Sequence, residues 1–518
     1  MDGTGKDADE TTETYKYDSS HRVISHTNQN GKTEYYTYTG AVVTSYEDYN
    51  ANQYKYYYNS MNQLITIVAP DGSITRKMYN AAGVQTGEQT ADGGYTEYTL
   101  NKIGNITRIT DAMGYATDFE YDKMYNITKA VDPQNNACIY TYDGNGNELS
   151  KTDADGNTTR YEYDSRDRKI KETLPNGAAY TYTYDKNGNL ISVTDPDGNV
   201  TENKYDIVLN LPTEHTDSLG NVTAYSYTVT GNIKEITYSD GTKVSYEYDL
   251  TGSLIKYTDE TGLVTEYSYD GCKNVVQTTK NGTQTYTYEY DSLNRQTCVT
   301  DEAGNITKYK YDSMGRVVEV TDANGNTSSA VYDLNGNTVS VTDAKGNTTL
   351  NVYDEVNNLI STKDANGNIT NYSYDKMQQL VSTTDALNGI TAYTYDSVGN
   401  VIKVTDANQN SNEIKYDLLG NVKEVALSDG STSTFEYDAL GRTIKSTDAA
   451  GLIKVYSYDS MGRTTSVTDN TGAEITYDYD EYGRLVSRTD VLGRSETYEY
   501  DAFSRVVSTV GIDKNKTV

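Results

Sequence analysis

The feature that most constrains this chain is a Tyr-Asp dipeptide that recurs every 21 residues. It occurs at Tyr248-Asp249 and Tyr269-Asp270 and keeps this spacing as far as Tyr500-Asp501. A fixed period of this length means that one supersecondary unit has been copied end to end. The tyrosine position can be followed back to Tyr17 through 24 positions, with one step of 22 residues, one step of 20 and a leucine at Leu100.

The repeats occupy almost the whole chain, with no linker and no second composition. We therefore expect a polar N-terminal lead-in over residues 1–14, one continuous array of about 24 repeats over residues 15–510, and a C-terminal tail over residues 511–518. The usual prior for 518 residues, three or four globular domains, does not apply to a repeat array.

The composition favours a thin β-sheet over a thick hydrophobic core. Hydrophobic residues make up 35% of the chain, Trp is absent, Phe occurs three times and Tyr occurs 53 times. A tyrosine ring can cover apolar surface while its hydroxyl stays in water, which suits a sheet that is half solvated on both faces. The abundance of Thr, Val and Tyr also favours strands over helices.

One repeat, YDSMGRVVEVTDANGNTSSAVY over residues 311–332, predicts a β-hairpin. It contains two Asp-x-x-Gly tetrapeptides, Asp312–Gly315 and Asp322–Gly325. Asp at the first position and Gly at the fourth are typical of a type I turn followed by a residue with positive φ. The segments 316–321 and 327–332 are β-branched and free of Pro, so each repeat is predicted to be two strands, and successive hairpins join through the second turn.

The second strand of most repeats ends in Tyr-x-Tyr, as in Tyr267-Ser268-Tyr269. Alternation places both rings on one face of the sheet. We expect the rings to flank side chains of the intervening strand, such as Val318 and Val320, in cross-strand contacts of roughly 0.2–1 kcal/mol each. Tyr288-Glu289-Tyr290 and Tyr498-Glu499-Tyr500 follow the same pattern.

The number of hairpins predicts a sheet that cannot stay flat. Roughly 48 strands at about 4.8 Å each give a ribbon on the order of 230 Å wide. The right-handed twist of strands forces such a ribbon to coil or close. The predicted fold class is therefore all-β: tandem hairpins in a curved spiral or tubular sheet that is hollow rather than core-packed.

Charge and composition also limit partners and location. The net charge is −31 and the pI is about 4.4, which argues against nucleic acid and anionic membranes as partners. No 18-residue apolar run predicts membrane insertion. The start of the chain lacks the basic and apolar regions of a signal peptide. Cys138, Cys272 and Cys298 are too few and too scattered to predict a disulfide framework or a zinc site.

The frame Tyr-Asp-x-x-Gly-Arg/Asn, followed by Thr-Asp-Ala-x-Gly-Asn, resembles the YD repeats, also called Rhs repeats. Good matches are Tyr142–Asn147 and Tyr458–Arg463, and the resemblance covers about residues 15 to 510. Such repeats occur in bacterial polymorphic toxins, in shell components of Tc toxins and in teneurins. The repeat-defining positions include Tyr248, Asp249, Tyr269, Asp270, Tyr311, Asp312, Gly315, Asp322, Gly325, Tyr458, Asp459 and Gly462.

The resemblance implies a spiral β-shell that encloses a cargo, commonly a toxin domain, or an adhesive barrel at a cell surface, and therefore an extracellular or bacterial cell-surface location. Bacterial members usually end the repeats with a core segment, including an Asp-Pro-x-Gly stretch, that caps the shell. Here Asp-Pro occurs only at Asp132-Pro133 and Asp195-Pro196, inside ordinary repeat turns. We therefore expect a section of shell whose partners are flanking parts of a larger polypeptide or an enclosed cargo domain.

Calcium binding is a weaker alternative. Asp153-Ala154-Asp155-Gly156 and Asp195-Pro196-Asp197-Gly198 resemble the first half of an EF-hand loop, but the bidentate Glu at position 12 is missing. Asp153, Asp155, Asp195 and Asp197 are thus weak metal candidates, and the repeated turn explains them without an ion.

No constellation of residues predicts an enzyme or a cofactor. His21, His26 and His215 are isolated in the sequence, and no Ser/His/Asp or Cys/His set stands out. Acid–base work by two carboxylates needs different surroundings for each of them, and identical turns give no reason for such a difference.

Two binding functions remain open. The tyrosine-rich segments 35–38 and 54–58 could stack against sugar rings, which predicts a glycan-binding or adhesion module. The strand edges at the two ends of an uncapped array could pair with other copies, which predicts a self-assembling filament or homo-oligomer. Because neighbouring turn carboxylates repel each other at low salt, such assembly should strengthen as salt rises.

Overall fold

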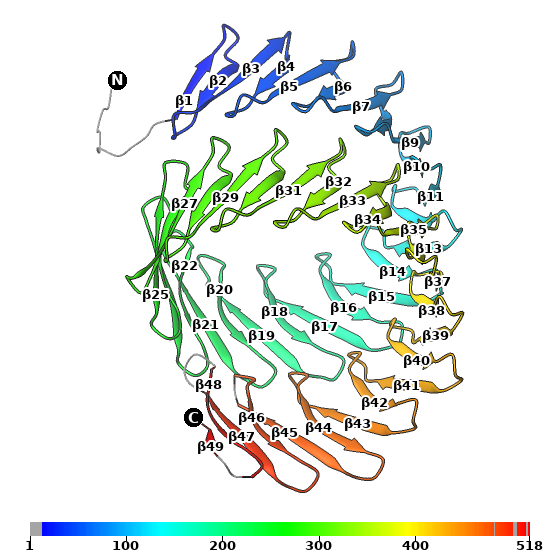
Figure 1. Ribbon diagram of the computed structural model, residues 1–518. Helices are drawn as coiled ribbons and strands as arrows, with labels where there is room; N and C mark the ends of the chain where they lie inside the picture. The colour runs from blue at the N-terminus through cyan, green and yellow to red at the C-terminus, as the bar shows by residue number, and fades with distance from the viewer. Residues whose placement is uncertain (1–12, 481, 501–504, 514–515, 518) are drawn as a thin grey trace. The chain divides into compact units, whose positions relative to one another are not determined.

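The structure is a computed structural model that describes residues 13–480, 482–500, 505–513 and 516–517. These residues form 49 β-strands of one sheet and contain no helix (Figure 1). Within the described residues there is accordingly no helix long and apolar enough to cross a membrane. Each strand runs antiparallel to the partner with which it is described, as in β29 with β30 and β30 with β31.

The odd-numbered strands precede the Tyr-Asp dipeptide, and most of them end at its tyrosine. Their bounds are β1 Thr14–Tyr17, β3 Thr33–Thr39, β5 Gln53–Tyr58, β7 Ile74–Tyr79, β9 Tyr95–Leu100, β11 Ala116–Tyr121, β13 Ala137–Tyr142, β15 Thr158–Tyr163, β17 Ala179–Tyr184, β19 Val200–Tyr205, β21 Val222–Tyr227, β23 Lys243–Tyr248, β25 Val264–Tyr269, β27 Gln284–Tyr290, β29 Ile306–Tyr311, β31 Thr327–Tyr332, β33 Thr348–Tyr353, β35 Ile369–Tyr374, β37 Ile390–Tyr395, β39 Ser411–Tyr416, β41 Thr432–Tyr437, β43 Ile453–Tyr458, β45 Glu474–Tyr479, β47 Ser495–Tyr500 and β49 Lys516–Thr517.

The even-numbered strands follow the dipeptide. Their bounds are β2 Val23–Thr27, β4 Val42–Glu47, β6 Leu64–Val68, β8 Gln85–Gln89, β10 Ile106–Thr110, β12 Ile127–Val131, β14 Glu148–Thr152, β16 Lys169–Thr173, β18 Leu190–Thr194, β20 Pro212–Thr216, β22 Ile233–Thr237, β24 Leu254–Thr258, β26 Val275–Lys280, β28 Gln296–Thr300, β30 Val317–Thr321, β32 Thr338–Thr342, β34 Leu359–Lys363, β36 Leu380–Thr384, β38 Val401–Thr405, β40 Val422–Ala426, β42 Thr443–Thr447, β44 Thr464–Asp469, β46 Leu485–Thr489 and β48 Val506–Val510.

Each repeat has two turns at opposite ends of its strands. We call the turn between an odd strand and the next even strand, such as 312–316, the Tyr-Asp turn, and the turn between an even strand and the next odd strand, such as 322–326, the linking turn. In the first, the Gly315 amide donates to the Asp312 carbonyl at 3.1 Å and the Asp312 amide to the Arg316 carbonyl at 3.0 Å. Gly315 has φ 86° and Gly325 has φ 82°, so the predicted turn with positive φ at Gly is confirmed in both places.

The two irregular steps of the repeat are absorbed in turns. The 22-residue step falls in the turn 206–211, where the Asp206 amide bonds the Leu211 carbonyl and one extra residue is accommodated. The 20-residue step falls between β3 and β4, which are joined by only two residues, 40 and 41. Because turns tolerate length changes that a strand register does not, the hairpins on either side keep their pattern.

The register differs from the prediction at the Tyr-Asp end of each hairpin. Tyr309 lies opposite Val320 as expected, but Tyr311 lies opposite Val317 and not Val318. A β-bulge between Lys310 and Tyr311 places two residues of β30 against one residue of β29. The same shift occurs in most described hairpins of this type, for example at Tyr248 and at Tyr458. Val318 was therefore the wrong partner, because strict alternation takes no account of a bulge.

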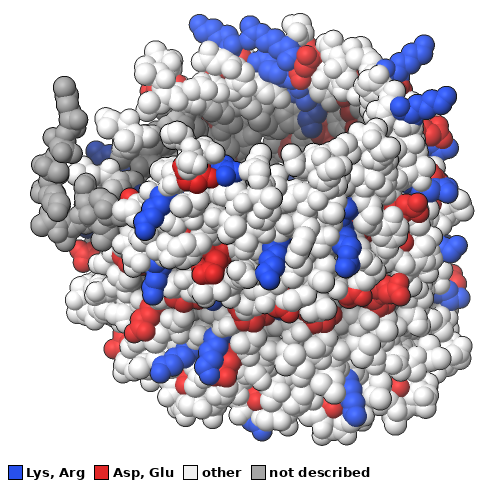
Figure 2. Space-filling model, turned by 90° about the horizontal axis from the view of Figure 1, so that it is seen from above, with Lys and Arg blue, Asp and Glu red and all other residues white. Residues whose placement is uncertain are grey.

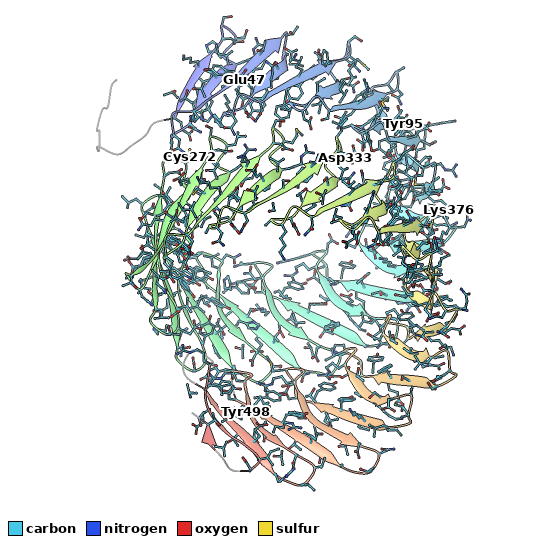
Figure 3. All side chains as sticks on the ribbon, in the orientation of Figure 1. Glu47, Tyr95, Cys272, Asp333, Lys376 and Tyr498 are labelled. Carbon is cyan, nitrogen blue, oxygen red and sulfur yellow. The ribbon has the colours of Figure 1, made fainter. Side chains whose placement is uncertain are left out.

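The sheet is thin and has almost no buried core. Among the described residues, Val244 and Cys298 are the buried hydrophobic residues, and no large side chain is fully buried. The Tyr-x-Tyr pairs share one face, as predicted: Tyr498 and Tyr500 of β47 are half-buried while Glu499 between them is exposed (Figure 3). The stabilising contacts are thus spread evenly along the array, as in other repeat proteins.

The chain divides into two compact units, each built from separate stretches of sequence. Unit 1 comprises Met1–Phe119, Val131–Gln134 and Thr265–Ile390, and unit 2 comprises Glu120–Ala130, Asn135–Val264 and Thr391–Val518. The predicted all-β class of tandem hairpins is confirmed within both. The predicted limits of the array stay predictions, since residues 1–12 of the lead-in and residues 514–515 and 518 of the tail lie outside the described part of the chain.

Candidate functional site

The aspartate of the Tyr-Asp turn holds the turn together through its side chain. Oδ1 of Asp312 accepts hydrogen bonds from the amides of Met314 at 2.9 Å and Arg316 at 2.9 Å. In the linking turn, Oδ1 of Asp322 accepts from the amides of Asn324 and Asn326, both at 2.9 Å. Asp is therefore required at the first turn position because a short carboxylate can reach two backbone donors of its own turn.

The tyrosine of the dipeptide connects its own hairpin to the preceding one. The Tyr332 hydroxyl donates to the carbonyl oxygen of Val317 at 2.9 Å, and Val317 is the residue beside the bulge of β30. A bulge interrupts the ladder of backbone hydrogen bonds, so a side-chain donor at this point is stabilising. Tyr38, Tyr58, Tyr79, Tyr184, Tyr205, Tyr227, Tyr248, Tyr290, Tyr311, Tyr353, Tyr374, Tyr416, Tyr437, Tyr458, Tyr479 and Tyr500 make the same bond to the residue 15 positions earlier.

An arginine at the end of several Tyr-Asp turns makes a second connection between hairpins. Nε of Arg463 donates to Oδ2 of Asp459 at 2.7 Å, and Nη1 donates to the carbonyl of Asp480 in the next Tyr-Asp turn at 3.2 Å. The guanidinium carbon lies 4.8 Å from the ring centroid of Tyr479, within the range of a cation–π contact. Arg168, Arg295, Arg316 and Arg442 are placed in the same way.

These hydrogen bonds lower the pKa of turn aspartates. The Arg168 side chain lowers the pKa of Asp164 from its usual value to about 2. Hydrogen bonds from Asn147 lower the pKa of Asp143, and hydrogen bonds from Asn326 lower the pKa of Asp322. A hydrogen bond donated to a carboxylate favours its ionised form, so each of these turns is most stable with the aspartate charged.

Within unit 1, linking turns contact Tyr-Asp turns that lie about 240 residues later in the sequence. We call these contacts, together with the equivalent ones in unit 2, the seam. The Asn30 amide group donates to Asp270 at 3.1 Å, and the Asn50 amide group donates to Asp291 at 3.2 Å. Further pairs are Arg316 with Asp71 at 3.6 Å, Asp92 with Asn335 at 3.3 Å and Gln134 with Asp375 at 2.8 Å.

Unit 2 contains the same kind of seam. The Ser397 hydroxyl donates to Asp155, Nη2 of Arg442 pairs with Asp197 at 2.5 Å, and the Ser218 hydroxyl donates to the Ser460 carbonyl at 3.0 Å. In Figure 1 the paired runs are coloured blue and green in unit 1, and cyan and orange to red in unit 2. The seam residues on the linking side are mostly the third residue of their turn, a position that the turn itself leaves free to vary.

The sequence separations across the seam show why these two turn types meet. The hydrogen-bonded pairs are separated by 240 to 245 residues in both units. Eleven repeats of 21 residues and the ten residues from Asp312 to Asp322 make 241. Linking turns and Tyr-Asp turns lie at opposite edges of the sheet, so a half-integral number of repeats brings the linking edge of one run onto the Tyr-Asp edge of another.

The weak calcium candidates have protein partners in these turns. Oδ1 of Asp153 accepts from the amide of Asn157 at 2.8 Å, and Oδ1 of Asp195 accepts from the amide of Asn199 at 2.9 Å. Asp155 and Asp197 are the seam residues described above. In the described part of the chain, no group of three or more His, Cys, Asp or Glu side chains is arranged to hold a metal ion.

The repeat-defining residues occupy the positions that the turn geometry requires. Tyr248, Tyr269, Tyr311 and Tyr458 end their strands, and Asp249, Asp270, Asp312 and Asp459 each accept two amide hydrogen bonds of the following turn. Figure 3 marks the equivalent Asp333 in the turn after β31. Gly315, Gly325 and Gly462 have positive φ. The structure distributes these residues along two edges and does not gather them into one site.

The tyrosine-rich segments near the N-terminus do form a depression. A cavity of about 370 Å³ is lined by Tyr36, Val43, Tyr46, Tyr56, Tyr58 and Leu64 on neighbouring strands β3 to β6. The hydroxyls of Tyr36 and Tyr46 donate to Oε1 and Oε2 of Glu34, each at 2.8 Å. Burial of these phenols, followed by the bonds to Glu34, raises the pKa of both tyrosines, so they remain protonated donors and their rings are held in place.

His26 is not isolated in the structure, although its sequence position suggested so. Its Nδ1 lies 3.1 Å from Oε1 of buried Glu34 and 2.6 Å from the Tyr49 hydroxyl. Its ring stacks on Tyr15 at 4.3 Å between centroids. Antiparallel pairing of β2 with β3 places His26 opposite Glu34, which spacing along the chain does not reveal. His215 has one neighbour of this kind, Asn203 Oδ1 at 2.9 Å, and His21 lies in a turn with φ 61°.

The surface charge follows the turns. A band of carboxylates crosses the face shown in Figure 2, with Lys and Arg side chains above and below it. Cys138, Cys272 and Cys298 are free thiols. Nothing in these side chains provides a nucleophile beside a base, and the edges of the sheet are where residues from distant repeats meet.

Family models match two long parts of the chain. The RHS Repeat model matches residues 101–137, 142–179, 170–200, 205–243, 248–285 and 290–327, and the Teneurin YD-shell model matches residues 364–508. These matches fall on the hairpins whose Tyr-Asp and linking turns are described above. The chain belongs to the YD-repeat (Rhs-repeat) family. The comparison with curated proteins found no match.

Solved structures with the same fold are Tc toxin components. A Tc holotoxin pore from Photorhabdus luminescens matches with a TM-score of 0.65 at 13% identity, covering 95% of this chain and 34% of that one. A TcdB2-TccC3 structure without the hypervariable C-terminal region matches with a TM-score of 0.64 at 14% identity, also covering 95% and 34%. This YD-repeat chain thus spans about a third of the length of those chains, and the likeness concerns the fold.

Sequence reasoning missed the seam, the tyrosine–carbonyl bonds and the cluster around Glu34. The tyrosine bond had a usable signal, because 53 Tyr against three Phe indicates that the hydroxyl is needed. The seam had none in any single repeat, since its partners depend on how many hairpins intervene.

Proposed function

We propose that this YD-repeat chain is a non-catalytic section of shell wall that encloses or displays a cargo, as part of a larger toxin-delivery or cell-surface protein. The seam is the observation that carries the proposal: in each unit, turns about 241 residues apart are hydrogen-bonded edge to edge. Such contacts turn a ribbon of hairpins into a continuous wall. The match to Tc toxin components over 95% of the chain supports the same role.

The proposed surroundings follow from the chain's share of its relatives. Because the chain spans about a third of the matched Tc toxin chains, the partners we propose are flanking parts of a longer polypeptide or an enclosed domain. An extracellular or bacterial cell-surface location fits the acidic, hairpin-rich composition and the family. Nucleic acid is not a proposed partner, given a net charge of −31.

Protease protection tests enclosure directly. The complete product of the reading frame that contains these repeats would be treated with a protease before and after denaturation, and its fragments identified by mass spectrometry. We expect a segment outside residues 13–517 to resist cleavage until the repeats unfold. A matched variant, Asp197→Arg, reverses the charge opposite Arg442 in the seam and should make that segment cleavable earlier. Equal cleavage of every segment from the start would contradict enclosure.

A glycan-binding role is a second candidate, favoured by the tyrosine-lined depression of about 370 Å³. Tyrosine rings can stack on a sugar ring in such a depression. We expect binding on a glycan array to be lost in Tyr56→Ala and kept in Tyr57→Ala, because Tyr56 lines the depression and its neighbour alternates to the other face of β5. A purified chain that binds no glycan removes this candidate.

A further inference from the structure

Three consecutive Tyr-Asp turns of unit 2 present large apolar side chains to solvent. Ile207, Val229 and Leu250 each occupy the second position of their turn, and their side chains are 91%, 98% and 107% exposed. The first of these turns also carries the one-residue insertion, which adds Val208 at 83% exposure. Exposed apolar groups grouped on adjacent hairpins are typical of an interaction surface, because single ones are common but contiguous ones are not.

The same turn position is covered elsewhere in unit 2, and this shows what fits it. Leu418, at the second position of its Tyr-Asp turn, is 56% exposed. It lines a cavity of about 930 Å³ together with Leu174 and Pro175 of a linking turn from the earlier run. An apolar tip at the Tyr-Asp edge is thus matched by an apolar linking turn across the seam, as the hydrophobic effect requires.

Unit 2 also carries an apolar linking turn that no described residue covers. Val491 and Leu492 are the second and third residues of the turn 490–493, and they are 53% and 72% exposed. The third position is the one that Asp155 and Asp197 use in the seam. Beside the three exposed tips, a cavity of about 680 Å³ is lined by residues of the turns that contain Val229 and Leu250, so there is room to receive such a turn.

We propose that a second copy of this chain docks on the apolar Tyr-Asp tips (Ile207, Val208, Val229 and Leu250) through its linking turn at Val491 and Leu492. The contact repeats the seam between two molecules. It joins two different surfaces, so it is heterologous and can add further copies head to tail. Both surfaces lie in unit 2, and the inference is independent of whether the shell encloses a cargo. Since the edges are rich in carboxylates, association should strengthen as salt screens their repulsion.

Sedimentation velocity over a range of protein concentrations tests this contact. For the wild-type chain, we expect the average mass to rise with concentration and to rise further with salt. A tip variant, Ile207→Ser with Val229→Ser and Leu250→Ser, should weaken association by roughly tenfold or more, because apolar side chains that become buried would be lost. An edge variant, Val491→Ser with Leu492→Ser, should do the same. Lys186→Ser, at the second position of another Tyr-Asp turn, is the matched control and should associate as the wild type does.

Mixing the two variants separates this contact from other modes of assembly. The tip variant keeps an intact linking turn and the edge variant keeps intact tips, so an equimolar mixture should form a dimer and stop there. A wild-type chain that stays monomeric at every concentration overturns the proposal. So does association that neither variant weakens, which would indicate pairing through the end strands β1 and β49. The substituted side chains are exposed, and unchanged circular dichroism will confirm that the variants fold.

Discussion

At the scale of single residues, the tyrosine of the dipeptide does two jobs that no other side chain combines. Its ring covers half-buried sheet, and its hydroxyl donates to a carbonyl beside the bulge of the preceding hairpin, as Tyr332 does to Val317 at 2.9 Å. Phe would keep the first role and lose the second. This explains why a chain with 53 tyrosines has only three phenylalanines, and why the hydroxyls point along the array instead of into a core.

Two neighbouring tyrosines of β5 provide a test of the hydroxyl. Tyr58 donates to the Val43 carbonyl at 2.9 Å, whereas Tyr57 is 51% exposed on the other face. We expect Tyr58→Phe to lower the free energy of unfolding by about 1 kcal/mol, because a backbone carbonyl loses its donor. Tyr57→Phe should leave it nearly unchanged. Urea unfolding of both variants, followed by circular dichroism, makes the comparison, and equal losses would argue against the bond.

The turn aspartates predict how the fold responds to acid. Arg168 lowers the pKa of Asp164 to about 2, from a model value of 3.8. A carboxylate whose pKa is lower in the folded chain contributes stability above its unfolded pKa, and that stability is lost as the pH falls through the folded pKa. We therefore expect urea unfolding midpoints to fall between about pH 4 and pH 2. Asp164→Asn should lower stability at neutral pH and reduce this fall, and a variant with an unchanged pH profile would contradict the assignment.

At the scale of the hairpin, arginine at the fifth position of the Tyr-Asp turn links one element to the next. Arg463 bonds Asp459 in its own turn, the Asp480 carbonyl in the next turn, and the face of Tyr479. A planar guanidinium can make these three contacts at once, and a lysine ammonium cannot. Where Asn replaces Arg, as at Asn337, the amide bonds Asp333 and reaches Asn357 in the next turn instead.

Arg463→Lys should therefore loosen the contact between two adjacent hairpins. We expect a loss of about 1 kcal/mol in local stability, since one charge-assisted bond and the stacking on Tyr479 are removed. Hydrogen exchange at β44 and β45 measures it. Lys445→Met, which removes an exposed ion pair with Glu436, is the control and should change exchange little. Equal exchange in both variants would mean that the arginine does not join the hairpins.

Sequence reasoning works well for the turns of this element and fails at its bulge. Asp312 and Gly315 act within five residues of each other, so their pattern is visible in one repeat. The bulge that moves Tyr311 from Val318 to Val317 depends on how two strands leave the turn, and neither strand contains an unusual residue. The pairing of His26 with Glu34 was missed for the same reason, because it arises across strands.

At the scale of the whole chain, the seam converts the repeat count into contacts. The half-integral spacing of 240 to 245 residues brings linking turns onto Tyr-Asp turns in both units. The sequence predicts that such a sheet must coil, but the number of hairpins per return depends on the summed twist of many strands. Small twist differences change that number, so Asn50 and Asp291 could not be paired from their local sequences.

Two deletions test whether the edges, and not only the individual pairs, matter for folding. Removing residues 333–353 takes out one whole repeat of 21 residues and joins Tyr332 to Asp354, so every later turn keeps its edge. Seam pairs such as Arg442 with Asp197 would be shifted by one repeat, but linking turns would still face Tyr-Asp turns. We expect a folded protein with a moderately lower unfolding midpoint, because strand pairing supplies most of the stability of a repeat array.

Removing residues 322–331 instead takes out one linking turn and most of β31, and joins Thr321 to Tyr332. Every later turn then changes edge, so Tyr-Asp turns would face Tyr-Asp turns and rows of carboxylates would meet without their amide and arginine partners. We expect this shorter deletion to be the more damaging one, with a lower unfolding midpoint and faster proteolysis. If the two deletions are tolerated equally, hairpin stacking alone holds the sheet together, and the seam follows from the coil without stabilising it.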